Sequence, residues 1–250
     1  MLVVRVATPE PLWVPVNGSG VATLSTSTLS AASHAITAQY VGNASYGSST
    51  SADVSQVVNK GATSAALTSS TNPSVYGQGV TFTATVTATA PSTGTPTGTV
   101  NFLDGATNIG TAILNGSGVA TLTTSSLGVA SHSITAVYVG NANYLTSTSN
   151  AVNQLVNKGA TSTSLVSSAN PSVFGQGVTF TVTVTATSPS VGTPAGSVDL
   201  FDGAANIGTV TLNGSGVATL STSSLTVASH SITAVYAGNV SYSTSTSNAI

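Results

Sequence analysis

The sequence predicts an all-β chain of tandem β-sandwiches arranged head to tail. A long segment recurs without drift, apolar and polar residues alternate with period two inside it, and turn-forming Gly, Asn and Pro residues separate the alternating stretches. No stretch combines helical periodicity with capping residues. We therefore expect each recurring segment to fold as a unit of facing sheets.

The repeat has a fixed period. The segment Asn-Gly-Ser-Gly-Val-Ala-Thr-Leu begins at Asn17, Asn115 and Asn213, so each of the two intervals spans 98 residues. This period is too long for a solenoid unit of about 20 to 50 residues and suits a whole domain that has been copied. Each complete copy should fold by itself.

The register of the repeat divides the chain into four segments. The first does not match the corresponding part of the next copy, the second holds only the C-terminal half of a copy, the third is complete, and the fourth has a clipped last strand. Their bounds are 1–16, 17–60, 61–158 and 159–250. We expect the chain to be a fragment of a longer protein. The partial copy should retain about four strands. It should fray or pack against its neighbours, because a chain much shorter than about 60 residues buries too little surface to be stable alone.

The complete copy reads as seven strands. In the best-defined one, Val80, Phe82, Ala84 and Val86 point inward and alternate with threonine. Seven short strands without a helix require two sheets packed face to face, which is an immunoglobulin-like sandwich. The expected strands are 66–69, 80–88, 100–103, 109–114, 119–123, 133–139 and 147–156.

One difference between the copies supports the expected core. Phe102-Leu103 becomes Leu200-Phe201, a change of order that we expect to conserve the volume buried near that point.

The composition excludes several classes of function. Charged residues make up 3% of the chain, and three Lys plus Arg leave no basic patch for a nucleic acid. Cysteine is absent, which excludes disulfides and thiolate metal sites. No apolar run approaches the roughly 18 residues of a membrane span. We predict no nucleic-acid partner and no membrane insertion.

Several motifs in order resemble the bacterial immunoglobulin-like repeats over residues 17–250. They include Asn-Pro-Ser-Val, Gly-Gln-Gly-Val-Thr-Phe-Thr, Gly-Val-Ala-Thr-Leu and Ser-His-Ser-Ile-Thr-Ala-Val-Tyr. The resemblance implies a β-sandwich found in arrays in exported or surface proteins, where it acts as a spacer or adhesive module, and hence an extracellular or cell-surface location. Relatives often carry Gly-Asp after the Tyr, whereas this chain has Gly-Asn, at Asn43, Asn141 and Asn239. This departure weakens any cation site there.

The three histidines are the side chains suited to acid or base chemistry near neutral pH: His34, His132 and His230. Asp104 and Asp202 could pair with the second and third, and Ser131 or Ser133 flanks His132, so a Ser-His-Asp arrangement can be written down. The first copy has no equivalent Asp. We expect structural histidines at the sandwich corner, no catalytic residue and no enzyme activity.

Metal and cofactor sites are not expected. Calcium prefers several oxygen ligands, carboxylates among them. Asp104 and Asp202 stand in Asp-Gly turns, and Asp199 is the one further carboxylate close in sequence to Asp202. A hairpin turn explains these residues better than a metal site.

The predicted function is that of a structural spacer or stalk whose partners are the neighbouring repeats. The joint at 156–161 has no Pro and no long Gly/Ser run that would decouple the domains. The alternative is an adhesive module that binds a glycan or a surface protein through its loops, 90–98 and 105–108. These loops offer small residues and no Trp or Arg anchor, so the spacer is preferred.

Overall fold

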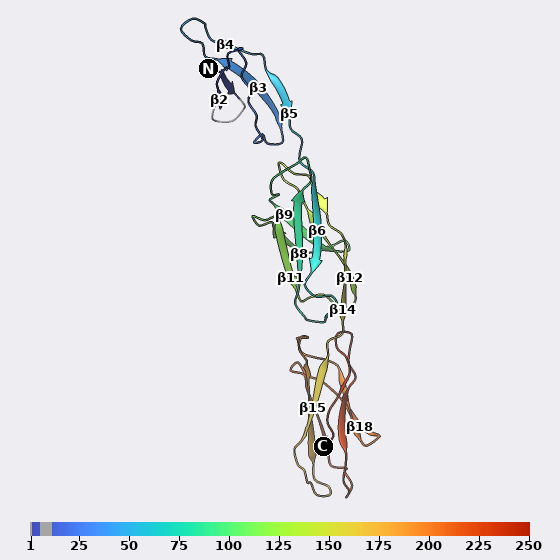
Figure 1. Cartoon of the computed structure of the whole chain (residues 1–250). Coiled ribbons are helices and arrows are strands. Elements are labelled where there is room, and N and C mark those ends of the chain that lie inside the picture. Colours follow the sequence, from blue (N-terminus) through green and yellow to red (C-terminus); the bar gives the residue numbers. More distant parts are fainter. Residues whose placement is uncertain (1, 6–11) are drawn as a thin grey trace.

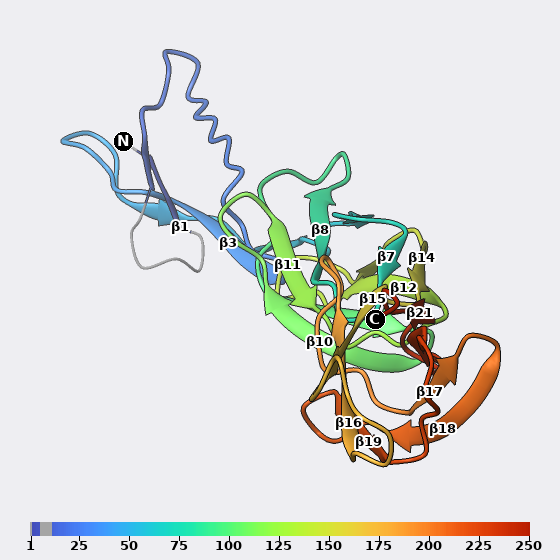
Figure 2. The ribbon, with the colours of Figure 1, turned by 90° about the horizontal axis from the view of Figure 1, so that it is seen from below.

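Three β-rich units follow one another along the chain (Figure 1). The computed structural model describes residues 2–5 and 12–250, and all regular structure in that part of the chain is β-strand. Viewed along the row, the sheet of the first unit projects to one side of the other two (Figure 2). No helix capable of spanning a membrane occurs among the described residues. The predicted all-β tandem architecture is confirmed.

One sheet of the middle unit contains three antiparallel strands in the order β11-β8-β6. Their bounds are Val119–Thr124, Val80–Ala88 and Thr63–Ser69. Along β8 the residues Val80, Phe82, Ala84 and Val86 are buried, and the threonines between them are partly or fully exposed. The inward face predicted from the alternation is confirmed.

The facing sheet of the middle unit has the order β10-β9-β12-β14-β7, with β13 also paired to β12. The pair β14–β7 is parallel, with Val156 opposite Ser74. The strands span Thr107–Ile113, Thr99–Asp104, Ser131–Tyr138, Val152–Asn157, Ser74–Val75 and, for β13, Ser147–Thr148.

The last predicted strand, 147–156, is divided into β13 and β14. Between them the Ser149 hydroxyl accepts a hydrogen bond from the Ala136 amide, and the Asn150 side chain accepts one from the Leu67 amide. These side-chain bonds replace the regular ladder, so a continuous strand was a wrong prediction here. The short strand β7 was not predicted, because two residues are too few to show an alternation.

The core of the middle unit lies between the two sheets. Phe82 and Val86 from one sheet and Phe102, Ile134 and Tyr138 from the other are fully buried in one apolar cluster. Each such side chain contributes roughly 1.5–3 kcal/mol when it leaves water. The two-sheet interior expected from the sequence is therefore present.

The third unit repeats this arrangement with sheets in the order β15-β16-β19 and β18-β17-β20-β21. Leu200 is buried where Phe102 lies in the middle unit, whereas Leu103 and Phe201 are only partly buried. The swap therefore leaves a smaller side chain in the core, and Val182 on the opposite sheet replaces the smaller Ala84. The strands are Thr161–Ser167, Val178–Ala186, Val217–Thr222, Ala205–Thr211, Ser197–Asp202, Ile232–Tyr236 and Ser245–Thr246.

The first unit has a single sheet in the order β2-β1-β3-β4, with β5 also paired to β3. Within 17–60 the structure has three strands, not the four expected, because 17–32 contains none. In the middle unit the corresponding strand, β11, pairs with β8, and the described residues hold no counterpart of β8 before residue 17. The strands of this unit are Leu12–Val14, Leu2–Arg5, Ser33–Tyr40, Ser49–Thr50 and Val54–Val57.

The strands β1 and β2 keep the register of the repeat although their sequence does not match it. Leu2 lies opposite Tyr40, as Val100 lies opposite Tyr138 one period later. Val14 lies opposite Leu2 in the same way that Ala112 lies opposite Val100. The β1–β2 hairpin therefore takes the places that β9 and β10 take in the middle unit.

Candidate functional site

A histidine stands at or just before the start of the strand that crosses each sandwich corner. In the middle unit, His132 Nδ1 lies 2.6 Å from Asp104 Oδ2 and Nε2 lies 3.0 Å from the Gly128 carbonyl oxygen. The third unit repeats this with Asp202 and the Thr226 carbonyl around His230, at the same two distances. Because both partners of each ring only accept hydrogen bonds, the arrangement is fully satisfied when both ring nitrogens carry a proton.

The surroundings raise the pKa of both histidines above the ordinary value. Burial lowers the pKa of His132, but the hydrogen bonds to the Gly128 carbonyl and to Asp104, together with the charge of Asp104, raise it by more. For His230 the bond to the Thr226 carbonyl has the largest effect, and Asp202 raises the pKa further. The histidines are thus held toward the protonated form, which is a poor general base.

The Ser-His-Asp arrangement is not assembled. The His and Asp residues meet, but the Ser131 hydroxyl donates to Asn153 Oδ1, 2.5 Å away. Both nitrogens of His132 are already bonded, so neither is free for a nucleophile. In the first unit His34 Nε2 is bonded to the Ser30 carbonyl oxygen at 2.8 Å. The position that corresponds to Asp104 there is Val6, which lies outside the described residues.

The carboxylates of Asp104, Asp199 and Asp202 lie in β-hairpins. Asp104 and Thr107 pair across the Asp-Gly turn, in which Gly105 has a φ of 56°. Asp199 accepts a hydrogen bond from the Thr209 hydroxyl at 2.5 Å. Among the described residues no group of three His, Cys, Asp or Glu side chains could hold a metal ion. Besides its place in the turn, the Asp104 carboxylate forms a hydrogen bond with His132 and fixes the orientation of the ring.

The joint between the middle and third units is a packed contact. The ring of Tyr76, which follows β7, meets the ring of Tyr242 edge-on, with centroids 5.3 Å apart and planes at 80°. Tyr76 also packs against the core of the third unit. The Ser190 hydroxyl donates to the Tyr76 carbonyl oxygen at 2.8 Å, and Lys158 Nζ donates to the Asn239 carbonyl oxygen at 2.5 Å. The two units are therefore joined by more than the chain itself.

The joint between the first and middle units is less developed. The Ala31 amide donates to Asn143 Oδ1 at 3.0 Å, and Lys60 Nζ donates to the Asn141 carbonyl oxygen at 2.7 Å. Tyr144 takes the place of Tyr242 here, but in the described part of the chain no aromatic ring stacks on it. Both joints thus contain a hydrogen bond from a lysine to a backbone carbonyl oxygen, and only the second joint contains a pair of aromatic rings.

Tyr76 was not predicted as a functional residue. A signal for it exists in both the middle and the third copies, because an aromatic residue precedes a glycine in each: Tyr76-Gly77 and Phe174-Gly175. Both glycines have positive φ, 79° and 80°, so the chain turns sharply and presents the aromatic ring at the end of the unit.

The loop 90–98, expected to be a binding loop in the adhesive alternative, lies at a joint. The hydroxyls of Tyr144 and Tyr138 donate to the Thr93 and Thr97 carbonyl oxygens at 2.6 and 2.8 Å and fasten the loop to its own unit. In the third unit, the equivalent loop lies so close to the middle unit that a Cβ on Gly77 would come within 2.7 Å of the Val191 carbonyl oxygen. In the third unit this loop therefore takes part in the contact between units.

Comparison with known proteins agrees with this architecture. The sequence pattern of the family described as Bacterial Ig-like domain (group 3) matches residues 7–59, 67–157 and 165–250. A comparison with curated proteins found no match.

Among solved structures, the chain is similar to the fibronectin(III)-like modules of Clostridium thermocellum CbhA, with 15% identity, a TM-score of 0.29, and coverage of 73% of this chain and 93% of that one. It is also similar to the Yersinia pseudotuberculosis adhesin InvE, with 18% identity, a TM-score of 0.34, and coverage of 74% and 58%. The three family matches cover most of the sequence, and the chain belongs to the bacterial Ig-like domain family, group 3.

Proposed function

We propose that the chain is a spacer whose repeats hold other domains of a bacterial surface or secreted protein away from the cell. Bacterial Ig-like repeats are typical of surface proteins. The observation that carries the proposal is the packed joint, in which Tyr76 of one unit covers the core of the next and meets Tyr242. A contact of this kind favours one relative orientation, so the length of the array grows with the number of copies.

The chemistry of the surface supports the same function. The described residues bring no nucleophile to His132 or His230, so we propose that the repeats are not enzymes and hold no catalytic, cofactor or metal site. The outward-facing residues are mostly Ser, Thr, Asn and Gly, and the chain has only eight charged residues, three basic and five acidic. Such a surface is soluble with little dependence on salt.

The division into units is part of the proposal. We place the boundaries at 16/17, 60/61 and 158/159, with 61–158 as the complete repeat. The core of 61–158 contains no residue from outside that range, which supports its folding as an independent unit. The segment 1–16 does not match the corresponding part of the next copy, but the family match begins at residue 7 and the strands of this segment complete the sheet of the first unit.

Small-angle X-ray scattering of the full chain tests the spacer. Three bodies about 30 Å long in a row predict a maximum dimension on the order of 100 Å and an extended distance distribution. A compact particle would contradict the proposal. The adhesive alternative is tested on a glycan array and by pull-down against surface proteins. Saturable binding by the full chain in either experiment would favour the adhesive function over the spacer function.

A further inference from the structure

The chain contains three Asn-Gly pairs, and each opens the repeated Asn-Gly-Ser-Gly turn. The pairs begin at Asn17, Asn115 and Asn213. In the middle unit the turn connects β10 with β11, and in the third unit it connects β18 with β19. The asparagine and the two residues after it are exposed in both turns. Water therefore has direct access to the asparagine side chain and to the backbone that follows it.

The two glycines of this turn differ in what the fold requires of them. Gly118 has a φ of 73°, and a Cβ there would lie 2.6 Å from the Val86 carbonyl oxygen, so glycine is needed at this position. Gly116 lies outside the left-handed region, and an added Cβ would meet no atom within 4 Å. Gly216 and Gly214 show the same contrast. The fold therefore does not require the glycine that directly follows the asparagine.

A glycine in this position permits a reaction between the asparagine side chain and the backbone. It leaves the backbone nitrogen unshielded, because no Cβ stands beside it. Asn115 Oδ1 accepts hydrogen bonds from the Ser117 and Val119 amides at 2.9 and 3.0 Å, and two such donors stabilise negative charge that develops on this oxygen. Within the described residues, neither the Gly116 amide nor Asn115 Nδ2 has a hydrogen-bond partner. Both nitrogens are thus free to react.

A second kind of asparagine turn lacks these features. Asn141 Oδ1 also accepts from two backbone amides, at 2.8 and 2.9 Å. Its Nδ2, however, donates to the Thr97 carbonyl oxygen at 2.9 Å, and the next residue is Ala142. Asn239 has the same kind of bond from Nδ2, also at 2.9 Å, and precedes Val240. These two residues provide a comparison within the same molecule.

We propose that the Asn-Gly pairs are sites of spontaneous deamidation, by which the neutral surface of the repeats acquires carboxylates after synthesis. The Gly116 nitrogen attacks Asn115 Cγ and forms a bond to it. The bond from Cγ to Nδ2 breaks, and Nδ2 leaves as ammonia with the proton that the Gly116 nitrogen loses. Water then opens the resulting five-membered cyclic imide at either of its carbonyl groups, which gives aspartate or isoaspartate.

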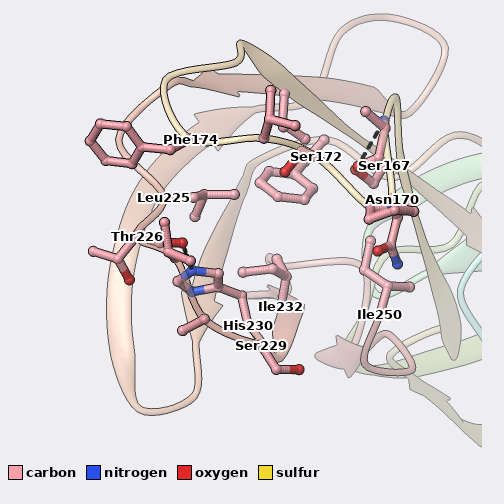
Figure 3. A pocket seen from close by; sticks show the side chains of 17 residues that line it. Ser167, Asn170, Ser172, Phe174, Leu225, Thr226, Ser229, His230, Ile232 and Ile250 are labelled. Carbon is pink, nitrogen blue, oxygen red and sulfur yellow. Dashed lines mark hydrogen bonds between the residues drawn. The ribbon is translucent and has the colours of Figure 1, made fainter.

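The histidine of the sandwich corner is not placed to take part in this reaction. His230 is bonded to Asp202, which precedes β18, and lies beside Thr226 and Ser229 (Figure 3). Asn213 follows the other end of β18, and a strand of seven residues is about 20 Å long. The proton therefore passes to solvent, and the reaction is a property of the turn itself. This modification goes beyond the spacer function and does not depend on it.

The two products have different effects on the turn. Aspartate keeps an acceptor oxygen for the Ser117 and Val119 amides and strengthens both bonds with its charge, so the turn persists. Isoaspartate adds a methylene group to the backbone and moves the carboxylate away from these amides. Each event adds one negative charge, and conversion of all three pairs takes the formal net charge from −2 to −5. Deamidation thus changes the charge of every modified repeat.

Mass spectrometry of the full chain, kept folded in neutral buffer for several weeks, tests the proposal. Peptides that contain Asn115 and Asn213 should gain the mass difference between an amide and a carboxylic acid, and electron-transfer fragmentation should detect both isomers. Peptides that contain Asn141 and Asn239 should stay unmodified over the same time. The absence of conversion at the Asn-Gly pairs, or equal conversion at Asn141 and Asn115, would overturn the proposal.

Gly116→Ala provides a matched variant. The new methyl group meets no atom within 4 Å, so the fold should be retained, but the methyl group hinders the approach of the backbone nitrogen to Asn115 Cγ. Conversion at Asn115 should fall many-fold, while Asn213 in the same chain should react at the rate of the parent. Gly214→Ala should have the reverse effect. Undiminished conversion at Asn115 in Gly116→Ala would contradict the imide route.

A second kind of variant covers the case in which an alanine disturbs the turn. Serine in place of Asn17, Asn115 and Asn213 keeps an acceptor oxygen for the turn and removes the reactive amide. On anion exchange, the aged parent should separate into increasingly acidic forms, and the aged triple variant should remain a single species. Acidic forms of the triple variant in the same amount as those of the parent would overturn the proposal.

Discussion

Tyr76 and Tyr242 meet edge-on across the boundary between the middle and third units, with ring centroids 5.3 Å apart. The contact joins the end of β7 in one sandwich to the loop before β21 in the next. Edge-to-face pairs contribute about 0.5–1.5 kcal/mol beyond the area that they bury. The aromatic pair and two hydrogen bonds therefore contribute to the orientation of the two units, together with the packing of Tyr76 on the core of the third unit.

Tyr76→Ala should loosen this joint and destabilise the third unit by about 1 kcal/mol, because the ring covers its core. Scattering should report a broader distance distribution, and residual dipolar couplings should report independent alignment of the two units. The control is Tyr46→Ala in the first unit, where the side chain is 70% exposed. Unchanged couplings in Tyr76→Ala would show that the hydrogen bonds suffice.

The histidine corners predict a dependence of stability on pH. The pKa values of His132 and His230 are raised in the folded state above the ordinary histidine value of 6.5. Their stabilising contribution is therefore fully present below that value and is lost as the pH rises through the folded pKa. The free energy of unfolding, measured by urea titration, should fall over this range. The double variant His132→Gln and His230→Gln should lose most of that slope, and a slope equal to that of the parent would contradict the assignment.

Gln154→Ala should destabilise the middle unit by about 1–3 kcal/mol, since the hydroxyl of Ser74 and the carbonyl of Thr71 would lose a buried partner. Leu155→Ala on the outer face of the same strand is the matched control and should cost much less. Chemical unfolding of 61–158 measures both. If the two substitutions lowered the free energy of unfolding equally, the hydrogen bonds of the Gln154 amide would contribute little to stability.

The paired differences between the two complete cores predict a compensation. Phe102→Leu alone should cost about 1 kcal/mol or more by leaving a cavity, and Ala84→Val alone about 1–3 kcal/mol by overpacking. Together they reproduce the pair found in the third unit, Leu200 with Val182, and should cost less than the sum. Strict additivity in this double-mutant cycle would show that the two positions do not share space.

Hydrogen exchange should be faster in 17–60 than in 61–158. The first unit has one sheet, and its residues are mostly exposed or only partly buried, His34 being an exception. Unpacked sheets open at low free energy, and exchange reports that opening. Equal protection in the two segments, measured by mass spectrometry, would mean that something else covers the open face.

The parts of the fold that depend on side-chain alternation were predictable from the sequence. Val80–Ala88 alternates over nine residues, and both the strand and its buried face followed from it. The division of 147–156 was not predictable, because it depends on where Ser149 and Asn150 meet other strands. The pairing of β1 with β3 was missed for another reason: ladder hydrogen bonds use the backbone, so a strand can keep its register after its sequence has diverged.

The candidate site was predictable only in part. The His132–Asp104 pair could be written down from residue types, but the Gly128 carbonyl that occupies the other nitrogen depends on the loop conformation. Tyr76 becomes significant only when two units are placed together.

The parallel pairing of β14 with β7 has a mechanical consequence. Tension on an array draws the start of one unit and its end in opposite directions, and in parallel neighbours such a load acts along the strands. The hydrogen bonds between them are then sheared together and do not open one after another. We expect the middle unit to resist stretching through this pair of strands.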